Sequence, residues 1–297
     1  MKKSNMRILI LGGNGMLGHA VYQSFKNDFD VYVTIRSSFG EVEELGIFDE
    51  NKTICSVNAL NFLLLEEKVK ELRPDIILNC IGIIKQIKEA HDAVKSIEIN
   101  SLFPHKLAIL CNKINARLIH LSTDCVFSGG KGNYNEADAA DPLDLYGRTK
   151  LLGEVAEGQA LTIRTSLIGK ELKTKHGLLE WFLSQEGKEI KGYTKAIFSG
   201  FPTIIFSEIL RDIILKYKSF KGIYHISSAP ISKFDLLMLI KKKMNLNIKI
   251  TLDDNFCCDR SLDSSKFQKE FGYTPPSWEK MVDELVVDMR KKCCVKI

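Results

Sequence analysis

Tyr146 and Lys150 stand four positions apart in the segment Tyr-Gly-Arg-Thr-Lys, at the predicted start of a helix. This spacing places both side chains on one face of the helix. A free phenol, with a pKa near ~10, transfers protons poorly at neutral pH, and an ammonium group one turn away lowers that pKa by stabilising the phenolate. The pair is therefore suited to general acid catalysis, in which Tyr146 protonates a carbonyl oxygen while hydride reaches the carbon. Alone the pattern is weak evidence, because it also occurs by chance on surface helices.

A third candidate lies where the predicted strand 117–121 gives way to Ser122-Thr123-Asp124. These polar side chains emerge at the carboxyl end of a strand, where parallel sheets bind ligands. Thr123 is suited to donate a hydrogen bond to a substrate carbonyl, which polarises the carbonyl and orients Tyr146. Thr123, Tyr146 and Lys150 are therefore the predicted catalytic residues, and Lys150 is also expected to hold the ribose of a nicotinamide cofactor.

A glycine turn, Gly-Gly-Asn-Gly-Met-Leu-Gly at 12–18, follows the apolar segment 8–11 and precedes a predicted helix. Gly12 allows a sharp turn, Gly15 lets backbone N–H groups approach a pyrophosphate, and Gly18 lets the helix pack closely on the strand. The helix N-terminus adds positive partial charge. The order of strand, turn and helix predicts a dinucleotide site. The predicted contacts in this turn are Gly12, Asn14, Gly15, Met16, Leu17 and Gly18.

The choice of cofactor depends on the end of the second predicted strand, which reads Val-Thr-Ile-Arg-Ser-Ser at 33–38. A carboxylate at this place accepts hydrogen bonds from the ribose hydroxyls of NAD, and none is present. Arg36 can pair with a 2′-phosphate and Ser37 can donate to it, so NADPH is favoured and NADH use stays open. Asn58, after the third strand, is either a contact to the adenine amino group or an exposed loop residue.

Short apolar segments and helical patterns alternate along the first half of the chain, which predicts an α/β fold with a doubly wound parallel sheet, Rossmann-like in form. The rhythm changes after residue 169, and we expect a smaller, discontinuous C-terminal substrate lobe. The predicted dinucleotide-binding domain comprises 1–168 and 197–226, and the lobe comprises 169–196 and 227–297. The predicted strands are 7–11, 31–35, 54–57, 76–79, 117–121, 161–164, 222–226 and 248–252. The predicted helices are 16–25, 60–71, 93–111, 145–158, 177–184, 207–217, 232–244 and 277–290, with 187–202 irregular.

The composition of the chain argues against several classes of function. The chain has 297 residues, 45% hydrophobic and 27% charged, with a net charge of +5. No basic cluster is interleaved with aromatics, so a nucleic acid partner is not expected. No apolar run reaches the ~18–20 residues that span a bilayer, and no signal sequence precedes the first strand, so a cytoplasmic protein without membrane insertion is expected. The eight cysteines, including Cys293 and Cys294, form no C-x-x-C motif, and the six histidines show no metal-ligand spacing, so free thiols and no metal site are expected.

Taken together, the glycine turn, Ser-Thr-Asp-Cys-Val-Phe at 122–127, Tyr146, Lys150 and Gly-Glu at 153–154 resemble the extended short-chain dehydrogenase/reductases, and within them the dTDP-4-dehydrorhamnose reductase family. Further matches are Ile-Arg-Thr-Ser at 163–166 and Phe-Pro-Thr at 201–203. The resemblance implies that Thr123, Tyr146 and Lys150 form a catalytic triad. It implies reduction of the 4-keto group of a nucleotide-linked 6-deoxyhexose in cell-surface polysaccharide biosynthesis. Further cofactor contacts are then expected at Cys80, Ile81, Gly82, Asn100 and Lys150, and substrate contacts at Lys85, Asp124, Cys125, Val126, Phe127, Trp181 and Arg260.

Two departures leave the substrate open. Cys125 stands where the family commonly has an aromatic residue, and 79–85 replaces an alanine-rich segment. The sequence therefore does not separate dTDP-4-dehydrorhamnose-like sugars from UDP-linked 2-acetamido-4-ketohexoses. One alternative is an epimerase or 4,6-dehydratase of the same fold, although a dehydratase has glutamate after the Thr-Asp pair where this chain has Cys125. Another is a non-catalytic NADP-binding regulatory subunit. The expected partner is the nucleotide-sugar substrate, and a homodimer stays open.

Overall fold

The computed structural model describes residues 4–217 and 219–292, which form two compact units. The first unit contains the chain up to Ser122, Asp144–Ile163 and Ser207–Ile223, and the second contains Thr123–Leu143, Arg164–Phe206 and the chain from Tyr224 onward. These bounds differ from the predicted lobes chiefly at Thr123–Leu143. That segment bonds within the second unit: the N–H of Tyr134 donates to the carbonyl of Ser261 at 2.9 Å, and the N–H of Asp259 donates to the carbonyl of Gly129 at 2.8 Å.

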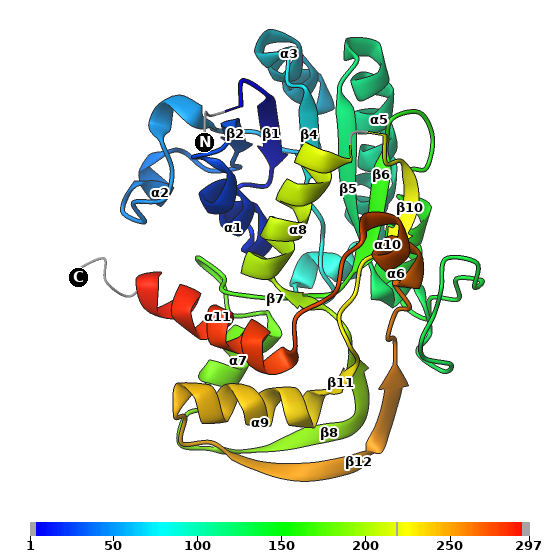
Figure 1. Cartoon of the computed structure of the whole chain (residues 1–297). Coiled ribbons are helices and arrows are strands. Elements are labelled where there is room, and N and C mark those ends of the chain that lie inside the picture. The colour runs from blue at the N-terminus through cyan, green and yellow to red at the C-terminus, as the bar shows by residue number, and fades with distance from the viewer. Residues whose placement is uncertain (1–3, 218, 293–297) are drawn as a thin grey trace. The chain divides into compact units, whose positions relative to one another are not determined.

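A seven-stranded sheet with the order β10-β6-β5-β4-β1-β2-β3 supports the first unit (Figure 1). Strand β1 pairs in parallel with β2 and β4, and β4 pairs in parallel with β5. The predicted Rossmann-like sheet is confirmed. Its strands are β1 (Arg7–Leu11), β2 (Asp30–Thr34), β3 (Thr53–Ile54), β4 (Ile76–Asn79), β5 (Arg117–Thr123), β6 (Leu161–Thr165) and β10 (Gly222–His225). The accompanying helices are α1 (Met16–Phe25), α2 (Gly40–Glu43), α3 (Phe62–Leu72), α4 (Ala93–Ile97), α5 (Phe103–Ile114), α6 (Leu145–Leu152) and α8 (Thr203–Lys216).

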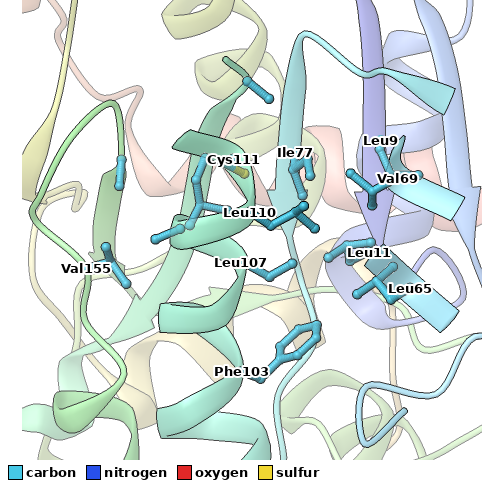
Figure 2. Close-up of a cluster of buried hydrophobic side chains, with 14 of the residues drawn as sticks. Leu9, Leu11, Leu65, Val69, Ile77, Phe103, Leu107, Leu110, Cys111 and Val155 are labelled. Atoms are coloured by element: carbon cyan, nitrogen blue, oxygen red, sulfur yellow. The ribbon is translucent and has the colours of Figure 1, made fainter. Parts of the chain in front are cut away.

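Apolar side chains of β1, β4, α3 and α5 meet in one buried cluster, which Figure 2 shows. Leu9 and Leu11 point to the same face of β1 because side chains alternate along a strand. They pack with Ile77 of β4, Leu65 of α3 and Leu107 of α5, none of which is accessible to solvent. Full burial of each such side chain contributes about 1.5–3 kcal/mol. The cluster thereby fixes the carboxyl ends of β1 and β4, from which the glycine turn and residues 80–82 continue.

The predicted helix 93–111 is divided by a π-helical turn, η3 (Glu98–Leu102), between α4 and α5. Pro104 has no N–H to donate to the carbonyl of Asn100 four residues earlier, so regular helical bonding fails at this place. A Cβ on Gly153 would lie 1.9 Å from that same carbonyl oxygen, so only glycine fits beside it. Gly153 caps α6, which therefore ends at Leu152 and not at the predicted residue 158.

The second unit contains a three-stranded sheet in the order β11-β8-β12. The prediction that 187–202 is irregular was wrong, because β8 (Glu189–Phe198) occupies most of it. Its inward positions alternate, but Gly192 and Ala196 fill two of them and weaken the apolar pattern. The other strands are β7 (Leu167–Ile168), β9 (Phe201–Pro202), β11 (Ile231–Ser232) and β12 (Lys249–Asp259), and the helices are α7 (Leu178–Leu183), α9 (Lys233–Met244), α10 (Ser265–Phe271) and α11 (Trp278–Lys292). Helix α10 was not among the predicted helices. Among all the helices in the described residues, none is long and apolar enough to cross a membrane.

Candidate functional site

The glycine turn at the end of β1 has the geometry of a phosphate cradle. Gly12 adopts φ +80°, a left-handed conformation that favours glycine, and a Cβ on Gly18 would lie 2.1 Å from the carbonyl oxygen of Gly12. Gly15 is exposed and begins α1 without a side-chain cap, so the first N–H groups of this helix are available to an anion. Asn14 and Met16 are half-buried and Leu17 is buried. Gly13, for which no role was predicted, is also confined, because a Cβ added there would lie 2.6 Å from the Cβ of Val33.

Two residues just after β2 carry hydrogen-bond donors that have no partner among the described residues. Arg36 is exposed, and neither an ion pair nor a hydrogen bond joins its side chain to another described residue. The Oγ of Ser37 is buried and, within the described chain, has no hydrogen-bond partner. A buried hydroxyl without a partner is costly, so the pair suits a ligand that carries a phosphate here. Asn58 is exposed, and its Oδ1 accepts a hydrogen bond from the N–H of Leu60 at 3.0 Å.

Asn79, which contacts His120, holds the backbone that follows β4 at residues 80–82. The Oδ1 of Asn79 accepts from the N–H of Ile81 at 3.1 Å, and its Nδ2 lies 3.1 Å from Nδ1 of His120 on β5. The N–H of Cys80 donates to the carbonyl of Leu11 at 3.1 Å. Burial raises the pKa of the Cys80 thiol to about 12, although the charge of Lys150 opposes this rise. The Cys80 thiol is therefore neutral. Gly82 and Lys85, which follow it along the chain, are exposed.

Asn100 joins the loop after β4 to α6 from within the π-helical turn. Its Oδ1 accepts from the N–H of Ile83 at 2.8 Å, and its Nδ2 donates to the carbonyl of Ile83 at 2.9 Å and to Oγ1 of Thr149 at 3.2 Å. These contacts use both ends of a fully buried amide. Asn100 thus positions the loop and the helix that carries Tyr146 and Lys150.

Helix α6 carries Tyr146 and Lys150 one turn apart. Asp144 caps its start, where the carboxylate accepts from the N–H of Gly147 at 2.7 Å. Tyr146 is half-buried, whereas Lys150 is only 5% exposed, and its Nζ donates to the carbonyl of Leu121 at 2.6 Å. Burial lowers the pKa of Lys150 to about 8, while Glu154 and Cys80 act in the opposite direction. An ammonium held in this way is both charged at neutral pH and fixed beside the end of β5.

Ser122 and Glu154 form a contact that the sequence analysis missed. The hydroxyl of Ser122 donates to Oε1 of Glu154 at 2.7 Å. Glu154 lies four residues after Lys150, and its carboxylate raises the pKa of that lysine. The motif Gly-Glu at 153–154 gave a local hint, but the link to Ser122 depends on the fold.

In the second unit, the residues after Ser122 bond mainly to one another. The hydroxyl of Thr123 donates to Oδ1 of Asp124 at 3.0 Å and accepts from the N–H of Cys125 at 3.1 Å. Arg260 donates from Nε to the carbonyl of Phe127 at 2.8 Å and from Nη1 to Sγ of Cys125 at 3.6 Å. The structure therefore brings the predicted substrate residues Asp124, Cys125 and Arg260 together. Trp181 on α7 is exposed.

Two predicted substrate contacts are buried. Val126 and Phe127 are 0% exposed over the whole residue, so they lie in the core and offer no surface to a ligand. The ring of Phe127 stacks on Tyr134 with centroids 4.2 Å apart, and the guanidinium carbon of Arg164 lies 5.2 Å from the Phe127 ring centroid. These contacts pack the segment after Thr123 against Tyr134 and Arg164.

In the part of the chain that the structure describes, no three His, Cys, Asp or Glu side chains are grouped so that they could hold a metal ion. The described cysteines, which are Cys55, Cys80, Cys111, Cys125, Cys257 and Cys258, are free thiols. Cys293 and Cys294 lie outside the described residues.

Comparisons with known proteins give one family and several relatives. The model of the RmlD substrate binding domain matches residues 6–291. The chain is similar to dTDP-4-dehydrorhamnose reductase of Escherichia coli (strain K12), with 27% identity over 94% of this chain and 98% of that protein. It is also similar to methionine adenosyltransferase 2 subunit beta of Bos taurus, with 32% identity over 51% of this chain but only 42% of that protein. Among solved structures, dTDP-4-dehydrorhamnose reductase from Bacillus anthracis str. Ames in complex with NADP matches 96% of this chain and 99% of that chain, with 23% identity and a TM-score of 0.79.

Proposed function

Since the chain belongs to the RmlD substrate binding domain family, we propose that it is an NADPH-dependent reductase of the 4-keto group of a nucleotide-linked 6-deoxyhexose in cell-surface polysaccharide biosynthesis. The observation that carries the proposal is the buried ammonium of Lys150, held by the carbonyl of Leu121 one helical turn from Tyr146. The name of the Escherichia coli relative supports the substrate class. Both dTDP- and UDP-linked sugars fit the proposal.

The cofactor fits the chain at three places, which are the glycine cradle, the open start of α1 and the donors Arg36 and Ser37. NADPH, when bound, would supply the hydride. In the proposed reaction Tyr146 gives the proton to the substrate oxygen, and Lys150 stabilises the phenolate that remains. Thr123 exchanges its bond to Asp124 for one to the substrate carbonyl, which polarises that carbonyl. Asn100 positions the helix that carries Tyr146 and Lys150, and Asn79 positions the backbone of residues 80–82.

The direct test is NADPH oxidation by the purified protein, followed through the loss of near-ultraviolet absorbance. dTDP- and UDP-linked 4-keto-6-deoxy sugars are offered separately. Consumption that depends on one sugar is the expected result and identifies its nucleotide. Tight NADPH binding without consumption of either sugar would contradict the proposal. It would favour the non-catalytic NADP-binding subunit, an alternative supported by the similarity to methionine adenosyltransferase 2 subunit beta.

Arg36→Ala should discriminate between the two nicotinamide cofactors. Loss of a charge-assisted contact to the 2′-phosphate is worth about 1.5–3 kcal/mol, which corresponds to roughly 10- to 100-fold weaker NADPH binding. Affinity for NADH should stay unchanged, since that cofactor has no phosphate there. Fluorescence titration with both cofactors measures the effect, and the exposed Lys113→Ala is the matched charge control. Equal loss for NADH and NADPH would remove the proposed role of Arg36.

Glu154→Gln should move the basic limb of the pH–rate profile to lower pH. The Glu154 carboxylate raises the pKa of Lys150, so its loss lets the ammonium deprotonate more easily. Ser122→Ala removes a hydrogen bond to Glu154 but keeps the charge of the carboxylate, so it should move the limb much less than Glu154→Gln does. Glu157→Gln, an exposed neighbour, is the matched control and should leave the profile unchanged. Identical profiles for wild type and Glu154→Gln would contradict the electrostatic role.

A further inference from the structure

A pocket of about 550 Å³ opens in the first unit at the amino ends of its central strands. Its lining includes Met6 before β1, Asp75 before β4 and Arg117 at the start of β5. Because β1, β4 and β5 are parallel neighbours, their amino ends lie side by side at the same end of the sheet (Figure 1). Gly12 and Asn79 lie at the opposite ends of their strands. The pocket is therefore separate from the proposed cofactor and catalytic residues.

Arg117 is an uncompensated cation in this pocket. Only 9% of the residue is exposed, and its Nη2 donates to the carbonyl of Phe220 at 2.7 Å. Its buried Nε has no hydrogen-bond partner, and no carboxylate pairs with the guanidinium anywhere in 4–217 or 219–292. Burying a charge without a counter-charge is unfavourable, and a guanidinium keeps its proton. An anion that reaches Arg117 would relieve this cost.

The other residues that line the pocket indicate which further chemical groups a ligand would carry. Ile76, the register partner of Arg117, and Ile214 of α8 are buried apolar walls. The exposed amides of Asn115 and Gln159 supply further donors and acceptors. The carboxylate of Asp75 holds the N–H of Arg7 at 2.7 Å and adds one negative charge to the lining. The volume exceeds what an inorganic ion alone would fill.

We propose that this pocket binds a small organic anion, with its charged group on Arg117 and its apolar part against Ile76 and Ile214. This pocket shares no residue with the proposed reductase site, because the two sites use opposite ends of the strands. Phosphate monoesters and carboxylates share the required chemistry.

The test uses the full chain and four probes: phenyl phosphate, benzoate, inorganic phosphate and phenol. Thermal unfolding and methyl NMR of the isoleucines follow each titration. We expect phenyl phosphate or benzoate to raise Tm saturably and to shift the Ile76 and Ile214 methyl signals, whereas phenol does neither. The better of the two anions identifies the charged group. A response to inorganic phosphate equal to that to phenyl phosphate would overturn the organic part of the proposal.

Three variants locate the binding. Arg117→Gln should weaken it by at least about 10-fold, since a charge-assisted bond is lost. Asp75→Asn keeps an oxygen for the N–H of Arg7 and removes a negative charge, so it should strengthen binding by about 2- to 5-fold. Arg36→Ala, which is expected to weaken NADPH binding, should leave the affinity for phenyl phosphate and benzoate unchanged, and this separates the pocket from the cofactor loop. Absence of any saturable response, or a response lost in Arg36→Ala, would overturn the proposal. If Arg117→Gln does not fold, unshifted Ile76 and Ile214 signals or unchanged affinity in Asp75→Asn would overturn it equally.

Discussion

Tyr146→Phe should reduce turnover at least ~100-fold, since positioned general acid catalysis is typically worth that factor or more. The substitution removes one oxygen and keeps the ring of a half-buried side chain on α6. The carbonyl of Tyr146, which accepts from the hydroxyl of Thr149 at 3.1 Å, is unaffected. Cofactor affinity should therefore stay nearly unchanged, and the loss should fall on kcat. Single-turnover NADPH oxidation and fluorescence titration measure the two quantities.

Tyr224→Phe is the matched control for this loss. Its hydroxyl donates to Oε2 of Glu270 at 2.9 Å in the second unit, so the variant removes a phenol that takes no part in the proposed reaction. Turnover in this control should stay near the wild-type value. Undiminished turnover in Tyr146→Phe would exclude Tyr146 as the proton donor.

The first half of the fold could be predicted closely because its apolar runs and its turn residues indicate the same element bounds. For β1, α1 and β4 the observed bounds equal the predicted ones. Apolar runs set the strands, and Gly12 and Gly15 mark the turn between β1 and α1. The predictions were less accurate where one residue decides the structure, such as Pro104 at the π-helical turn and Gly153 at the end of α6.

Burial inside the second unit could not be predicted from spacing alone. Phe127 follows the Ser-Thr-Asp cluster and reads as part of a site, yet its ring lies in the core against Tyr134. In β8, Gly192 and Ala196 face inward where larger apolar residues would have marked a strand. Whether a small side chain faces the interior depends on the residues that pack against it, and these lie elsewhere in the sequence.

In the candidate site, too, local features could be predicted from the sequence, whereas contacts between distant residues could not. The spacing of Tyr146 and Lys150 gave their common helical face, but not the buried surroundings of Lys150. Ser122 and Glu154 are 32 residues apart, and Arg117 and Phe220 are 103 apart. Contacts at such separations depend on sheet order and loop paths, and no motif encodes them.

Lys150→Met should impair both proposed roles of the lysine. Without the ammonium the phenolate of Tyr146 loses its stabilising charge, so turnover should fall by ~100-fold or more. Loss of a charge-assisted bond to the ribose should also weaken NADPH binding by roughly 10-fold. Titration and single-turnover kinetics measure both effects, and the exposed Lys113→Met is the matched control. Normal cofactor affinity together with a normal rate would remove both roles.

Stability gives a readout of Lys150 that does not depend on substrate. Burial lowers its pKa from 10.5 to about 8, so between these values the unfolded chain binds more protons than the folded chain. The free energy of unfolding contributed by Lys150 therefore rises as pH increases from about 8 to 10.5. Lys150→Met should flatten this part of the stability profile relative to Lys113→Met, as measured by denaturant unfolding across the window. An unaltered slope would mean that Lys150 titrates as an exposed lysine, and the buried ammonium on which the proposed chemistry depends would then be absent.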